Sequence, residues 1–97
     1  MGISVYLRNQ VHAQTYAGTE VSLQFERVVA QAQQDELLAG VHPHADTMFN
    51  VAQLSKISEE LTTVQERCPE LADDIAALRV IFETIERQRG YLWVLGD

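Results

Sequence analysis

The sequence predicts a single α+β domain in which a small sheet of three or four strands is covered by three helices. Strict alternation of apolar and polar residues marks a strand near the N-terminus, and aromatic and branched residues fill another near the C-terminus. Between them, three stretches carry apolar residues at helical spacing. The expected order along residues 1–97 is strand, strand, helix, strand, helix, helix, strand.

The first strand is expected over residues 3–7, where the alternation is strict. After a turn, the weaker alternation of residues 11–17 predicts an edge strand. Gly18 ends this strand, and the hydroxyl of Thr19 is expected to cap the helix that follows. That helix would bury one stripe of apolar residues: Val21, Phe25, Val28, Val29 and Ala32.

A loop without periodicity leads to a short strand at residues 46–49. Asn50 is a strong helix cap, and Gln53 completes the pattern of a capping box. The helix that begins here carries the apolar stripe Leu54, Ile57, Leu61, Val64 and Cys68. A break at Cys68-Pro69 separates it from a second stripe, Leu71, Ile75, Leu78, Phe82 and Ile85. Two stripes joined by one tight break predict an antiparallel helical hairpin.

The hairpin is expected to end at Gly90, and a last strand follows at residues 91–95. Its side chains are apolar on both faces, which predicts a central strand beside residues 3–7. Trp93 is therefore expected in the core. The alternative is that Trp93 and Tyr91 anchor an interface, because these residue types are frequent binding hot spots.

Charge and composition exclude several functions. Seven Lys and Arg against 14 Asp and Glu leave a net charge of −7, which argues against a nucleic-acid partner. No apolar run approaches the ~20 residues of a membrane span, and the first residues do not form a secretory signal. The single cysteine suits a reducing compartment, so we expect a cytoplasmic protein.

Catalytic and metal-binding patterns are weak. The segment from His42 to Asp46 is the only cluster of metal-ligand residue types, and it lacks further ligands, so a solvated turn is the favoured interpretation. Cys68 completes an apolar stripe and has no histidine nearby, which favours a small core residue over a nucleophile. Adjacent acids such as Glu59-Glu60 are expected to be solvated. We therefore expect no enzymatic activity, no metal and no cofactor.

Acidic residues concentrate between residues 59 and 74, where six carboxylates and one base give −5 of the net −7. If the two helices form a hairpin, these groups converge at its tip and steer a basic protein partner. The alternative is that they only favour helix N-termini and solubility. The candidate partner-binding residues are Glu59, Glu66, Glu70, Asp73 and Asp74, with His42 and His44 of the loop.

Two segments carry a resemblance to a known family. A family of short bacterial proteins that share D-T-x-F-N-x-x-Q and Y-L-W-x-x-G-D resembles this chain in Asp46-Thr47-Met48-Phe49-Asn50-Val51-Ala52-Gln53-Leu54 and in Tyr91-Leu92-Trp93-Val94-Leu95-Gly96-Asp97. Such proteins are similar to the small immunity proteins of polymorphic toxin systems. The resemblance implies direct binding to a cognate toxin domain, without catalysis. The alternative is a small regulatory or structural module that self-associates through the helical hairpin, for example as a homodimer.

The shared residues also have a structural interpretation. Asp46 and Asn50 would shape a corner between loop and helix, which Phe49 would attach to the core. Gly96 and Asp97 would end the central strand. The motif residues expected to specify the fold are Asp46, Thr47, Phe49, Asn50, Gln53, Trp93, Gly96 and Asp97.

Overall fold

The computed structural model describes residues 2–11, 13–34, 36–42 and 44–96. Its elements are β1 (Ile3–Arg8), β2 (Gln14–Tyr16), α1 (Thr19–Val29), β3 (Thr47–Phe49), α2 (Val51–Arg67), α3 (Ala72–Gln88) and β4 (Tyr91–Gly96). Two short 3₁₀ helices, η1 (Leu37–Gly40) and η2 (Pro69–Leu71), precede β3 and α3. The predicted α+β class and order of elements are confirmed. Asp97, the last residue of the second motif, and Pro43 of the loop lie outside the described residues.

The strands form one antiparallel sheet in the order β2-β1-β4-β3. β4 is central, as predicted, and pairs with β1 along its length, from Gly96 opposite Ile3 to Tyr91 opposite Arg8. On its other side β4 pairs with β3, where Leu92 lies opposite Phe49. The two segments that carry the family resemblance therefore contribute the neighbouring strands β3 and β4, and the first of them continues into the start of α2.

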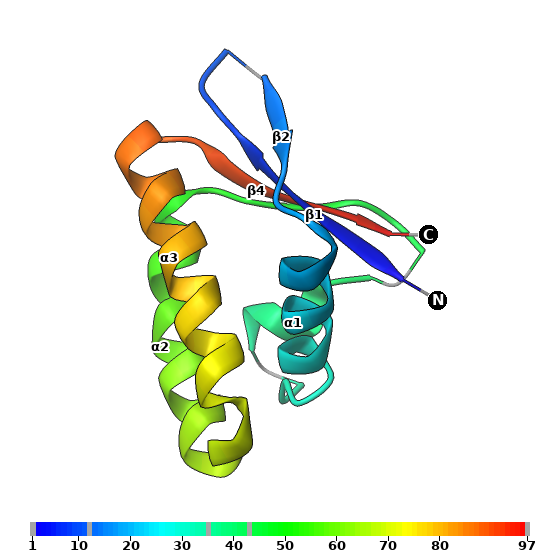
Figure 1. Cartoon of the computed structure of the whole chain (residues 1–97), viewed down its shortest axis with the longest axis vertical. Helices are drawn as coiled ribbons and strands as arrows, with labels where there is room; N and C mark the ends of the chain where they lie inside the picture. The colour runs from blue at the N-terminus through cyan, green and yellow to red at the C-terminus, as the bar shows by residue number, and fades with distance from the viewer. Residues whose placement is uncertain (1, 12, 35, 43, 97) are drawn as a thin grey trace.

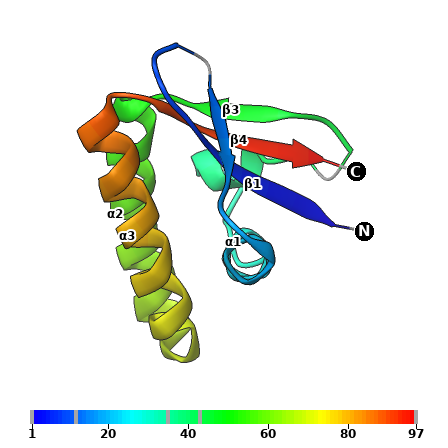
Figure 2. The same cartoon turned by 45° about the horizontal axis from the view of Figure 1, so that its top comes forward.

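All three helices lie on one side of the sheet, and α2 and α3 form the predicted antiparallel hairpin (Figure 1). The view turned by 45° shows the same separation into a sheet and a helical layer (Figure 2). The core lies between these layers, because both apolar stripes of the hairpin are buried apart from the half-buried Cys68. Residues from every layer contribute to it, among them Val5, Phe25, Leu38, Phe82, Leu92 and Val94.

The corner between β3 and α2 has the predicted capping box. The side-chain oxygen of Asn50 accepts a hydrogen bond from the Gln53 N–H at 2.8 Å, and the Gln53 side chain accepts one from the Asn50 N–H at 2.9 Å. Phe49 and Leu54 are both buried beside this cap, in the positions of a hydrophobic staple. A Cβ on Gly96 would lie 2.5 Å from the Ala45 nitrogen, so the loop before β3 packs closely on the end of β4.

The start of α1 corrects one prediction. Thr19 is the first residue of the helix and does not cap it; the preceding Gly18 has φ 110°, and no side chain bonds the first helical N–H groups. Instead the buried hydroxyl of Ser22 donates to the Gly18 carbonyl at 2.9 Å and accepts from the Val5 N–H at 3.0 Å. The entry to α1 is thus attached to β1 from inside the core.

The end of α3 differs in one detail from the prediction that Gly90 terminates the helix. The left-handed conformation that terminates the helix belongs to Arg89, with φ 52°, and the Gly90 N–H donates to the Ile85 carbonyl at 3.0 Å. Gly90 is required for another reason, because a Cβ there would collide with the carbonyl oxygen of Arg8. This close approach lets the turn from α3 into β4 pass the end of β1.

Candidate functional site

The sheet has a second face, which points away from the helices. Residues opposite each other in an antiparallel pair point to the same side, and neighbours along a strand alternate. Since Ile3, Val5, Leu92 and Val94 are buried against the helices, their neighbours point outward. We call this surface the outer face; its described side chains are Ser4, Tyr6, Arg8, Gln14, Tyr16, Met48, Tyr91, Trp93 and Leu95.

Aromatic residues are sorted between the two faces by type. The three tyrosines and the single tryptophan lie on the outer face, whereas the three phenylalanines are buried in the core. One row of side chains crosses all four strands, in the order Tyr16, Tyr6, Trp93 and Met48. The rings of Tyr6 and Tyr16 lie 5.3 Å apart, and Tyr16 and Met48 are 46% and 44% exposed at the ends of the row.

The expectation that Trp93 belongs to the core is wrong. Trp93 is half-buried and lies outside the core cluster, on the outer face between Tyr6 and Met48. The physical reason is that side chains alternate along β4. Leu92 and Val94, on either side of Trp93, point toward the helices and the core, so Trp93 points away from them. The alternative interpretation, an interface anchor, is compatible with this position.

Arg8 is the only charged side chain among the described residues of the outer face. Its guanidinium carbon lies 4.6 Å from the centre of the Trp93 ring, in a cation–π arrangement. Its Nε is one of two buried side-chain polar atoms without a hydrogen-bond partner among the described residues; the other is Oε1 of Gln24 on α1. Tyr, Trp, Met and Arg are the types enriched at the centre of protein interfaces, where Asp, Glu and Lys are depleted.

The acidic stretch of the hairpin divides into groups with different environments. Glu66, Glu70 and Asp73 are exposed around η2, at the tip of the hairpin. Glu59 is also exposed, but it lies eight residues before the end of α2, a rise of about 12 Å along the helix. The sequence predicted that all of these carboxylates converge at the tip. The structure shows that only some of them do.

Asp74 is held by an ion pair between α3 and α1. Its two carboxylate oxygens accept hydrogen bonds from Nη2 and Nε of Arg27, at 2.9 and 3.0 Å. The guanidinium lowers the pKa of Asp74 below its ordinary value, mainly through these hydrogen bonds, and the carboxylate of Asp74 raises the pKa of Arg27 in the same way. This carboxylate is engaged in joining two helices.

Glu60 corrects the expectation of a solvated acidic pair. Its side chain is buried, with 5% of its surface exposed, and accepts the N–H groups of Leu37 at 2.9 Å and Leu38 at 3.1 Å. The carboxylate thus satisfies the free donors at the start of η1. The signal in the sequence is its spacing: Glu60 follows Ile57 by three residues and precedes Val64 by four, on the buried stripe.

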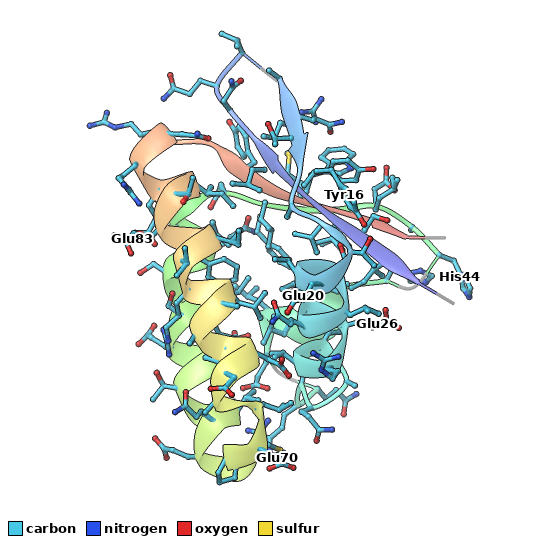
Figure 3. All side chains as sticks on the ribbon, in the orientation of Figure 1. Tyr16, Glu20, Glu26, His44, Glu70 and Glu83 are labelled. Atoms are coloured by element: carbon cyan, nitrogen blue, oxygen red, sulfur yellow. The ribbon has the colours of Figure 1, made fainter. Side chains whose placement is uncertain are left out.

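The histidine loop and the hairpin tip are separate. His42 and His44 are both exposed, and Nδ1 of His42 accepts the His44 N–H at 3.0 Å. Figure 3 shows His44 beside the sheet and Glu70 at the far end of the hairpin, so these candidate residues do not form one site. Tyr16 of the outer face is also remote from Glu70 in this view.

Other chemistry is limited in the described part of the chain. No group of three or more His, Cys, Asp or Glu residues is arranged there to hold a metal ion. Cys68 is a free, half-buried thiol whose Sγ lies 3.6 Å from Oε1 of Gln31. A hollow of about 400 Å³ beside α2 is lined by polar residues, but its buried carboxylate, Glu60, already binds η1.

Comparisons with protein-family models, with curated proteins and with solved structures find no match to this chain. Within the ranges that the structure describes, no helix has the length and apolar character needed to cross a bilayer.

Proposed function

We propose that this protein acts without catalysis, by binding another protein through the outer face. The observation that supports the proposal is the placement of every tyrosine and the only tryptophan on the outer face, where the hydroxyl of Tyr16 also lies 3.4 Å from Oγ1 of Thr19 at the start of α1. Tyr and Trp combine a large apolar ring with a polar atom, so they tolerate water before binding and contribute strongly when covered. Met48 and Arg8 complete an interface-like composition.

The resemblance of the two neighbouring strand segments to immunity-type proteins favours a toxin domain as the partner. In this proposal the protein resides in the cytoplasm and neutralises its cognate toxin by direct contact. Arg8 is the single charged side chain among the described residues of the outer face and contributes +1 to the net charge of −7. The rest of the chain therefore carries −8. An acidic surround of this kind favours the approach of a basic protein.

The exposed carboxylates of the hairpin tip have a smaller part in this proposal. Glu66, Glu70 and Asp73 lie at the end of the helices remote from the sheet, so they act on the rate of encounter and not on the central contact (Figure 3). Changing Glu66 and Asp73 to Lys should then slow association at low salt and leave the dissociation rate nearly unchanged.

Co-expression with the toxin encoded by the neighbouring gene tests the function. The wild-type protein should restore growth and form a complex on a sizing column. Trp93→Ala and Tyr6→Ala should weaken both effects, whereas Val80→Ala, at a 61% exposed apolar position on α3, should not. No rescue and no complex with the wild-type protein would exclude the toxin assignment. Full activity of both aromatic variants would place the contact elsewhere.

A further inference from the structure

Arg8 limits which protein surfaces fit the outer face. Its guanidinium lies over the ring of Trp93, so a partner that covers Trp93 also removes Arg8 from water. None of the described ion pairs involves Arg8, and its Nε has no acceptor among the described residues. A charge that is covered without an acceptor strongly opposes binding. The partner must therefore bring an acceptor to this point.

We propose that the partner presents a carboxylate to Arg8, within an apolar surface that packs on Tyr6, Trp93 and Met48. This inference rests on the proposed binding through the outer face and specifies its chemistry. A carboxylate is the protein group that best matches a guanidinium, since its two oxygens accept parallel N–H bonds. The stacking on Trp93 fixes the guanidinium in the middle of the aromatic row, where such a bond is shielded from water.

A second copy of the chain does not supply this group. The described side chains of the outer face include no Asp or Glu, so two apposed outer faces would offer each arginine neutral hydroxyl and amide oxygens but no carboxylate. Each copy also carries a net charge of −7, which opposes their approach.

A nucleic acid would offer a phosphate to Arg8 and bases that stack on the aromatic rings. Binding of a polyanion, however, depends on neutralising several phosphates with Lys and Arg. The outer face has one cation among its described residues, in a chain of net charge −7, so a protein carboxylate is favoured over a nucleic-acid phosphate.

The test uses the full-length protein and a displayed library of random dodecapeptides as the probe. Peptides that also bind the Trp93→Ala variant are removed during selection. The enriched peptides should share an Asp or Glu next to apolar residues. Because Trp93 is the only tryptophan, its emission reports directly on the outer face, and it should shift to shorter wavelength when a synthetic copy of the peptide binds.

Arg8→Gln should weaken the binding of such a peptide by about thirty-fold or more, since one partner of a covered charge pair is removed. Arg87→Gln is the matched control, because this arginine is 71% exposed on α3 and should leave the affinity unchanged. Replacing the acid of the peptide by its amide should cause the same loss with the wild-type protein and no further loss with Arg8→Gln. If Arg8→Gln does not fold, the comparison of the acidic peptide with its amide on the wild-type protein still tests the proposal.

The outcomes separate the two proposals. Peptides that require Trp93 but contain no acid, and bind Arg8→Gln equally well, would overturn the carboxylate and keep the outer face as the binding surface. No Trp93-dependent peptide at all would count against the outer face itself. A shift of Trp93 emission with single-stranded oligothymidylate would overturn the choice of a protein partner, and a dimer that Trp93→Ala abolishes would overturn the choice of a partner other than a second copy of this chain.

Discussion

The two faces of the sheet are made by the same strands but differ in what they bury. On the inner face, Leu92 and Val94 are fully buried against helices. On the outer face their neighbour Trp93 is half-buried, and Leu95 is 37% exposed. The aromatic residues follow the same division, with phenylalanines inside and tyrosines and tryptophan outside. Adjacent residues of one strand are therefore expected to serve different purposes, stability on one side and recognition on the other.

Buried polar groups lie on both sides of the sheet, and they differ in how they are satisfied. Among buried polar groups behind the inner face, Glu60 accepts two backbone N–H groups, and the Ser22 hydroxyl both donates and accepts. On the outer face, the Nε of Arg8 has no acceptor among the described residues. A buried group without a partner weakens a folded protein unless something else satisfies it. Oε1 of Gln24 on α1 is also without a partner among the described residues, so the outer face is distinguished by the charge of its unsatisfied side chain, Arg8.

The largest effect that separates the faces should come from the adjacent pair Leu92 and Trp93. Leu92→Ala removes a fully buried side chain and should lower the free energy of unfolding by about 2–5 kcal/mol. Trp93→Ala should cost less stability, because its ring is already partly in water, and should chiefly weaken partner binding. Urea unfolding of both variants measures the first effect. Equal losses of stability would mean that Trp93 serves the fold as much as Leu92 does.

An intermediate effect is expected at the adjacent acids of α2. Glu60→Ala leaves the N–H groups of Leu37 and Leu38 without their acceptor and should cost about 1–3 kcal/mol of stability. Glu59→Ala is the matched control, because its side chain is exposed, and it should change stability by less than about 0.5 kcal/mol. Thermal unfolding of the two variants checks this. Similar melting temperatures would show that the buried carboxylate does not hold η1 in place.

Trp93 and Glu60 also show which features of the structure can be predicted from the sequence and which cannot. The apolar pattern and the turn residues identified the four strands and the three α-helices with their buried stripes, because periodicity reports which residues share a side; the 3₁₀ helices η1 and η2 were not predicted. It does not report whether another element covers that side, which depends on contacts between distant segments. Trp93 was assigned to the core for this reason, and Glu60 to solvent, although its spacing places it on the buried stripe.

Local chemistry was equally informative where its partners are close in sequence. The capping box of Asn50 and Gln53 was found because both halves lie within one turn. The entry to α1 was missed because its hydrogen bond joins Ser22 to Val5, seventeen residues away. Among the candidate binding residues, Asp74 was assigned to a charged patch, while the structure pairs it with Arg27, forty-seven residues away.

The smallest effect is expected from this pair, which joins α1 to α3 within the helical layer. Since Arg27 is 52% exposed, solvent screens the interaction, and Arg27→Ala should cause only a small loss of stability at neutral pH. The folded-state pKa of Asp74 is lowered, so the stabilisation is fully present above the unfolded pKa of 3.8 and is lost as the pH falls from there through the lower folded-state pKa.

Unfolding curves of the wild type and Arg27→Ala should therefore differ at neutral pH and converge in acid. Arg87→Ala is the control, because Arg87 and Glu83 are both about 70% exposed and 3.8 Å apart, and its effect should be smaller at every pH. A difference that persisted unchanged in strong acid would show that Arg27 stabilises by packing and not through the charge of Asp74. Partner binding should be unaffected in either case, because the pair belongs to the layer that supports the sheet and lies away from the outer face.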